Sequence, residues 1–254
     1  MLKKMLIRWW LLLVPGLLAY SCTRSVEDLR ETLSHFESAP VVDYQVSRLQ
    51  VRNGDSLPVQ NISLLFVPQQ EEPVYPYYFR IEAAGDAIGL FCPGHYVETN
   101  PLTRVATAFA LAEDSLYRNA LISFPYLEHN LPEVMDCYAR GLQSESVRRL
   151  SDSLIGDTRV RRYLVGFHNA LFFSRSQGWY QLCVDPETAL PVEYSAHFRT
   201  DIGVSYKNED ITYRIDSLRL SGAPSDPPGL NNLPGDYTIR KFRPDIQIGQ
   251  DVYL

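Results

Sequence analysis

The chain has 254 residues, of which 45% are hydrophobic and 12% aromatic, and its formal net charge is −6. This composition is sufficient for a packed core, and the length fits one domain built around a large sheet. An acidic surface repels the phosphates of nucleic acids, so we expect no nucleic-acid partner.

The N-terminus is typical of a secretory signal. Three basic residues precede an apolar run over 9–18, which is shorter than the roughly 20 residues that a membrane-spanning helix needs. The run leads into "LLAYSC", which resembles a bacterial lipobox ending at Cys22. The resemblance implies cleavage after residue 21 and acylation of Cys22 by chains such as palmitate. Ordinary secretion with a chance cysteine is the alternative.

We therefore expect a signal peptide over 1–21 and a lipid-anchored protein of the cell envelope. Thr23, rather than an aspartate, follows the cysteine. This favours the outer membrane, with the protein facing the periplasm.

The first part of the mature chain is predicted to be one helix followed by strands. Residues 25–36 place apolar side chains on one helical face, and Ser25 with Asp28 can form a capping box. Asn53-Gly54 and Cys92-Pro93-Gly94-His95 are typical of hairpin turns. We expect strands around these turns at 44–51, 59–67, 75–82, 88–91, 96–97 and 102–109.

In the middle of the chain the spacing of apolar residues changes from that of strands to that of helices, and strand spacing then returns. Apolar residues at helical spacing predict helices at 113–124, 132–142 and 147–154. Strands are expected at 160–167 and 170–173, separated by His168-Asn169, and then at 179–184, 192–199 and 211–215. Residues 221–254 are rich in proline and glycine and predict a linker or a draped extended segment. The expected division is a signal peptide over 1–21, a sheet-and-helix domain over 22–220 and a C-terminal segment over 221–254.

Two stretches carry a family resemblance: "PYYFRIEAAGDAIGLFCPGHYVETNPLTRVA" (76–106) and "RRYLVGFHNALFFSRSQGWYQLCVDPETALPVEYSAHF" (161–198). Together they resemble the LolA/LolB-like outer-membrane lipoprotein carriers. The resemblance implies an α+β fold, in which a curved antiparallel sheet forms an unclosed barrel and helices cover its concave face. The space between sheet and helices holds acyl chains in the transport members.

A second likeness concerns the C-terminus. "LPGDYTIRKFRPDIQIGQDVYL" (233–254) resembles the joint after the sheet domain that precedes thioredoxin modules in some envelope redoxins. The Cys-x-x-Cys motif of thioredoxin is absent, so the redox chemistry of that family is not implied here.

In two predicted strands apolar and polar residues alternate, and four aromatic residues on their apolar faces mark where an apolar ligand would lie: Tyr77, Phe79, Tyr194 and Phe198. They are candidates for lining a ligand cavity. The alternative is that they pack against the helices as core.

Catalytic, metal and disulfide signals are weak. The five histidines lack metal-ligand spacing, and each is expected to be a surface or strand residue. Cys92 and His95 are expected to belong to a turn rather than to a metal site. Cys92, Cys137 and Cys183 lie far apart in sequence, and we favour no disulfide among them. We expect no metal, no cofactor and no enzymatic activity.

The tripeptide Asp-Ser-Leu occurs four times, with its serine at Ser56, Ser115, Ser153 and Ser217. It resembles the O-glycosylation signal of the envelopes of some Gram-negative anaerobes. The alternative is helix capping by Asp114 and Asp152, since aspartate favours helix starts.

These features predict a non-enzymatic envelope lipoprotein that binds an acyl chain or another apolar ligand in a half-barrel. The alternative is an interaction module that holds a protein partner, for example a separate redoxin, and has no ligand cavity.

Overall fold

The computed structural model describes residues 26–71, 73–83, 87–111, 120–121, 124, 126–171, 174–201, 206–222, 226–233 and 235–242. The helices are α2 (Glu27–Ser38), α4 (Leu131–Gln143) and the short η1 (Leu230–Asn232). The strands of the first half are β1 (Val41–Arg52), β2 (Asp55–Ser56), β3 (Gln60–Pro68), β4 (Tyr77–Ala83), β5 (Ala87–Cys92), β6 (His95–Asn100) and β7 (Val105–Ala110). Those of the second half are β8 (Arg148–Arg149), β9 (Ser153–Ile155), β10 (Thr158–Leu171), β11 (Ser174–Val184), β12 (Pro191–Asp201), β13 (Tyr206–Ser221) and β14 (Thr238–Lys241).

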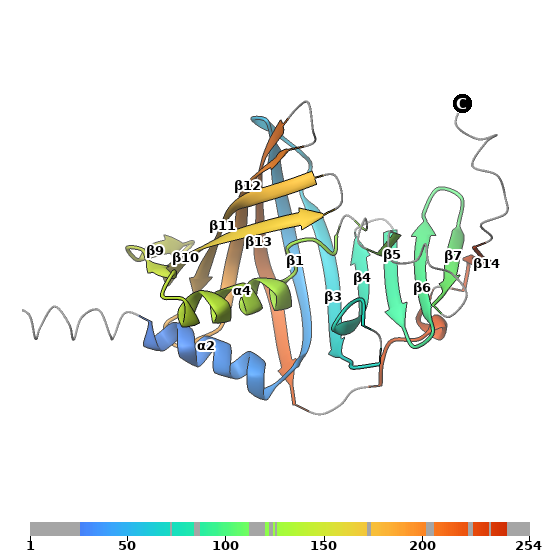
Figure 1. Cartoon of the computed structure of the whole chain (residues 1–254), viewed down its shortest axis with the longest axis horizontal. Helices are drawn as coiled ribbons and strands as arrows, with labels where there is room; N and C mark the ends of the chain where they lie inside the picture. The colour runs from blue at the N-terminus through green and yellow to red at the C-terminus, as the bar shows by residue number, and fades with distance from the viewer. Residues whose placement is uncertain are drawn as a thin grey trace, which may run out of the picture.

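The strands form one sheet, in the order β14-β7-β6-β5-β4-β3-β1-β13-β12-β11-β10-β8, with β2 beside β1 and β9 beside β10. Neighbours are antiparallel, except that β14 runs parallel to β7. The sheet is strongly curved, and α2 and α4 lie across one of its faces (Figure 1). The predicted α+β class, a curved unclosed antiparallel sheet with helices on its concave face, is confirmed.

Helix α4 is fixed to the sheet by capping and packing. Asn130 precedes it, and the Asn130 side chain accepts a hydrogen bond from the backbone N–H of Glu133. The buried hydroxyl of Tyr138 lies 2.8 Å from the backbone carbonyl oxygen of Tyr163 and 2.9 Å from that of Tyr180. These contacts hold α4 against β10 and β11.

Two hydrophobic clusters lie on opposite faces of the sheet. In β5, Phe91 belongs to the main cluster beneath the helices, whereas Leu90 belongs to a second cluster on the outer face of β5–β7. Successive strand residues point to opposite faces, which explains the division. Tyr237 and the partly buried Leu230 and Leu233 cover the second cluster.

The helix predicted over 147–154 is wrong. Two short strands, β8 and β9, occupy this stretch, and Gly156 at φ +58° turns the chain back into β10. Leu154 is 67% exposed, so the apolar spacing did not mark a buried helical face. The Asp152 carboxylate caps no helix and instead pairs with Arg149 and Arg159.

The break predicted at His168-Asn169 is also wrong, because β10 continues through both residues and pairs His168 with Gln177. In the C-terminal segment, Thr238–Lys241 joins the sheet as β14 instead of only draping over it. The strand predicted from residue 102 begins at Val105, after a turn. Most of the helix expected over 113–124 lies outside the described residues.

The local turn predictions are confirmed. Asn53 and Gly54 have φ values of +50° and +94° in the hairpin that follows β1. Gly94 has φ +76° between the paired residues Cys92 and His95. The first helix is present but starts at Glu27, after Val26, with no side-chain cap, and Ser25 lies outside the described residues.

Candidate functional site

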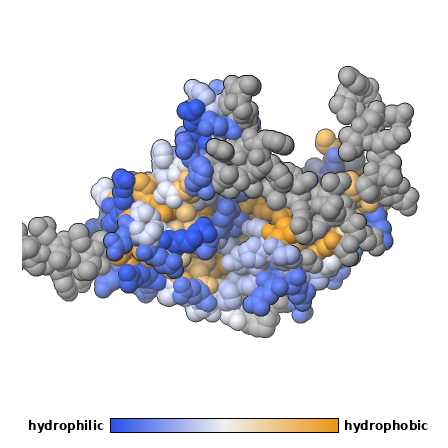
Figure 2. All heavy atoms as spheres, in the orientation of Figure 1, coloured by the Kyte–Doolittle hydropathy of each residue, from blue (hydrophilic) through white to orange (hydrophobic). Residues whose placement is uncertain are grey.

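An apolar groove opens between α2 and α4 at one end of the concave face; we call it the helix groove. Its volume is about 310 Å³, and its apolar lining includes Leu33, Phe36, Val42, Tyr77, Met135 and Ala139. The carboxylates of Glu37 and Asp136 also border it. Figure 2 shows hydrophobic residues reaching the surface on the side of the molecule that carries these helices, bordered by hydrophilic ones. Such a groove suits a small apolar ligand.

The middle of the concave face is filled. Tyr44 and Val46, which follow Val42 on the same face of β1, are 0% and 1% exposed. Phe79 and Tyr194 are equally buried, at 0% and 1%. These four side chains belong to the main hydrophobic cluster and pack as core.

The four predicted ligand residues therefore lie in different surroundings. Tyr77 lines the helix groove. Phe198 lines two other grooves, which are described below: a polar one on the concave face and one on the outer face of the sheet. Phe79 and Tyr194 belong to the core. A ligand-binding role for the four residues stays a prediction, and the structure does not bring them together around one space.

The opposite end of the concave face is polar. A groove of about 370 Å³ is lined there by Arg48, which is 8% exposed and donates to Gln60 Oε1 at 2.8 Å. Glu209 in the same groove accepts from Gln50 Nε2 at 2.9 Å and from Arg52 Nε at 2.6 Å. Arg48 lies six residues beyond Val42 on β1, roughly 20 Å away. The concave face thus has an apolar end and a polar end, separated by packed aromatic rings.

His129 was predicted to lie on the surface or in a strand, and that prediction is wrong. It is 2% exposed, has φ +61° in the turn before α4, and its Nδ1 lies 2.8 Å from the Tyr180 hydroxyl. Burial lowers the pKa of His129 from 6.5 to about 3, helped by the charge of Arg48. The ring is therefore neutral at physiological pH. The sequence indicated only that His129 precedes the helix predicted over 132–142, not that its ring is buried.

The pKa of the Glu133 carboxyl on α4 is shifted upwards, whereas that of His129 is shifted downwards. Burial, together with the charge of Glu128, raises the pKa of Glu133 from 4.5 to about 7. Its neutral form is favoured by the fold, so its contribution to stability is complete below pH 4.5 and is lost as the pH rises through about 7. The contribution of His129 is present above pH 6.5 and is lost as the pH falls towards 3.

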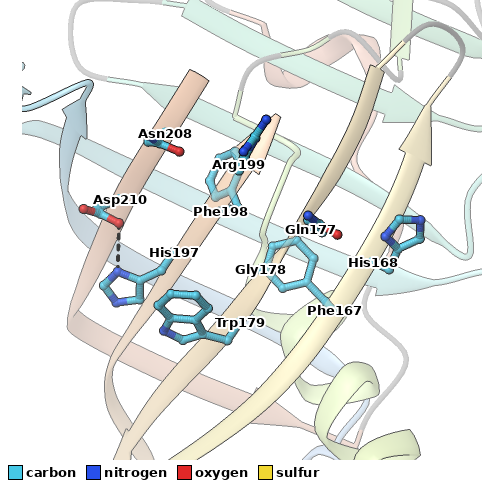
Figure 3. A pocket seen from close by; sticks show the side chains of 10 residues that line it. All are labelled: Phe167, His168, Gln177, Gly178, Trp179, His197, Phe198, Arg199, Asn208 and Asp210. Carbon is cyan, nitrogen blue, oxygen red and sulfur yellow. Dashed lines mark hydrogen bonds and ion pairs between the residues drawn. The ribbon is translucent and has the colours of Figure 1, made fainter. Parts of the chain in front are cut away.

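A third groove, the outer groove, has a volume of about 610 Å³ and is lined by residues of β10, β11, β12 and β13 (Figure 3). Trp179 stacks on His197 with ring centroids 5.5 Å apart and an interplanar angle of 20°. His197 Nδ1 lies 2.9 Å from Asp210 Oδ1. Nothing in the local sequence marks Trp179, His197 and Asp210 as a group, because only strand register brings them together.

Other predicted sites are placed as follows. Within the described ranges, no group of three or more His, Cys, Asp or Glu side chains could hold a metal ion. Cys92, Cys137 and Cys183 are buried free thiols. Ser56 and Ser217 are exposed and Ser153 is partly exposed, whereas Ser115 and Cys22 lie outside the described residues. No helix in the described part of the chain is both long and apolar enough to cross a membrane.

No family model matches the chain, and a search of curated proteins gives no significant match. Among solved structures, the MucA/MucB complex of Pseudomonas aeruginosa aligns over 80% of this chain and 59% of that chain, at 11% identity and a TM-score of 0.35. LprF from Mycobacterium bovis aligns over 82% and 97%, at 11% identity and a TM-score of 0.35. A LolA superfamily protein from Nitrosomonas europaea aligns over 75% and 94%, at 9% identity and a TM-score of 0.29.

The chain thus spans about three fifths of the matched chain in the first of these structures. At TM-scores of 0.29 to 0.35 these alignments carry no functional argument, and we draw the function from this chain's own residues.

Proposed function

We propose that this protein is a non-enzymatic lipoprotein of the cell envelope that binds an acyl chain or another apolar ligand in the helix groove. The observation that carries the proposal is an apolar groove of about 310 Å³ that remains open at the edge of a filled core. This volume is at the lower end of the range of small-molecule sites, roughly 300–1,000 Å³. The lipid anchor at Cys22 and the outer-membrane location are part of the proposal.

The filled centre of the half-barrel favours a second candidate, an interaction module that holds a protein partner. Phe79 and Tyr194 pack as core, as expected for a sheet domain without an internal ligand cavity. Under this candidate, the helix groove receives a partner's side chain instead of a lipid.

The two candidates differ in what a photoactivatable fatty acid labels. We would reconstitute the full chain in nanodiscs, irradiate it with a diazirine palmitate analogue, and map the crosslinks by mass spectrometry. If the helix groove binds an acyl chain, which we call the carrier function, crosslinks should lie on peptides of α2 and α4, and excess unlabelled palmitate should suppress them. The Ala139→Phe variant fills the groove and should lose these crosslinks, because Ala139 lines it and is only partly buried.

The matched control is Leu102→Phe, which adds an aromatic ring at a residue that is 93% exposed and lies in the turn before β7. It should keep the crosslinks. Thermal unfolding of both variants verifies that they fold. Crosslinks absent from α2 and α4 in the unmodified chain, or unchanged in Ala139→Phe, would reject the carrier function and leave the interaction module.

A further inference from the structure

The outer groove lies over two adjacent cross-strand rows, and every member of these rows except Gly166 lines it. One row, in pairing order across β10 to β13, is Gly166, Trp179, His197 and Asp210. The next row is His168, Gln177, Arg199 and Asn208. The neighbouring Phe198 is buried in the core. Because successive strand residues alternate in direction, both rows lie on the face away from the core.

The first row presents a supported aromatic surface. Trp179 is 48% exposed, although indole is a large apolar group. One neighbour across the sheet, His197, stacks on it, and Asp210 in turn orients His197. A ring held in place before binding loses less conformational entropy when a ligand arrives.

Gly166 is the other cross-strand neighbour of Trp179. It leaves open space beside Trp179, although the packing of the fold would accommodate a larger residue there. A Cβ added at Gly166 would have only the carbonyl oxygen of Gly178 within 4 Å, at 3.8 Å. By contrast, a Cβ at Gly178 would overlap backbone atoms of β12, so packing accounts for that glycine. A strand glycine often marks a bulge, a tight bend or a place that a ligand or another backbone approaches closely, and here the open space lies beside Trp179.

The second row surrounds the ring with groups of mixed hydrogen-bonding character and little net charge. Gln177 and Asn208 each offer a donor and an acceptor. Arg199 is balanced by Asp201, whose Oδ1 lies 3.1 Å from Arg199 Nε. Such a surface does not favour a polyanion, but it matches hydroxyl groups, which both donate and accept.

We propose that the outer groove binds a saccharide, with the C–H face of one sugar ring stacked on Trp179. Gln177, Asn208 and the outer oxygen of Asp210 hydrogen-bond the hydroxyls. The volume of about 610 Å³ lies within the usual range for ligand sites. The site is on the opposite face of the sheet from the helix groove, so it does not depend on lipid binding.

The test uses the full chain in nanodiscs, probed on a broad glycan array and then by fluorescence. The chain has three tryptophans, and the proposed cleavage after residue 21 removes Trp9 and Trp10, so Trp179 is the one tryptophan of the mature protein and can be excited selectively. A saccharide retained on the array should shift this emission saturably. Trp179→Ala should weaken array binding by at least about tenfold, equivalent to about 1.4 kcal/mol.

Gly166→Val should weaken binding to a similar extent without unfolding the protein, because its side chain fills the space beside Trp179. Leu154→Ala, at a site 67% exposed on β9, is the control and should bind normally. The proposal is overturned if the array shows no saccharide whose binding depends on Trp179, or if binding survives Gly166→Val. A Trp179-dependent dimer in analytical ultracentrifugation, without saccharide binding, would assign the groove to a second copy of the chain and also overturn it.

Discussion

Two glycines in neighbouring strands should respond in opposite ways to the same substitution. In Gly178→Ala, the new methyl group would overlap the carbonyl oxygen of His197 and lie 2.8 Å from the Cα of Phe198. These are backbone atoms of β12, so they cannot rotate away, and β11 must separate locally from β12. Overpacking costs about 1–3 kcal/mol, and a weakened ladder hydrogen bond adds about 1 kcal/mol. We expect a loss of about 2–4 kcal/mol in the free energy of unfolding.

Gly166→Ala on β10 is the matched control. Its methyl group meets only the carbonyl oxygen of Gly178, at 3.8 Å, which is an ordinary contact. Replacing a strand glycine by alanine then stabilises the fold by roughly 0.5–1 kcal/mol, because the unfolded chain has less conformational freedom to lose.

Thermal unfolding of the full chain measures both effects. At roughly 2–4 °C per kcal/mol for a domain of this size, Gly178→Ala should lower the midpoint by roughly 4–16 °C and Gly166→Ala should raise it slightly. Equal midpoints for the two variants would refute the reasoning. A loss of stability in Gly166→Ala would show that this glycine serves the fold, which would remove one support for a ligand site beside Trp179.

Three further predictions test separate features. Cys22→Ser should release the protein from membranes in cell fractionation, because the acyl anchor is lost; persistent membrane attachment would contradict the lipoprotein assignment. Glu133→Gln should flatten the pH dependence of stability and should raise the free energy of unfolding at pH 8 by up to about 3 kcal/mol, for a pKa moved from 4.5 to about 7. Urea unfolding at pH 5 and pH 8 measures this free energy, and values equal to those of the unmodified protein at both pH values would contradict the prediction. Replacing Ser56 and Ser217 by alanine should reduce the intact mass of protein purified from its native host if glycans occupy these serines, and a native mass equal to that of the bare lipoprotein would exclude them.

Features that depend on a few neighbouring residues could be predicted from the sequence alone. Asn53 and Gly54 in one turn, and Gly94 after Pro93 in the other, supply the positive φ values that these turns need, so both hairpins could be placed. Apolar residues at helical spacing predicted a helix over 132–142, and α4 spans Leu131–Gln143. Alternating apolar residues in β4 and β12 identified antiparallel strands with one buried face, because strand periodicity is local.

Which residues distant in sequence come into contact depends on how the whole chain packs. The stretch at 148–155 forms strands because it pairs with β10, although its apolar spacing also fits a helix. His129 is buried because the turn before α4 faces Tyr180, and nothing next to it in sequence requires this. The outer groove exists because register aligns Trp179, His197 and Asp210 across three strands. Register depends on packing across the whole sheet, so no short stretch of sequence encodes it.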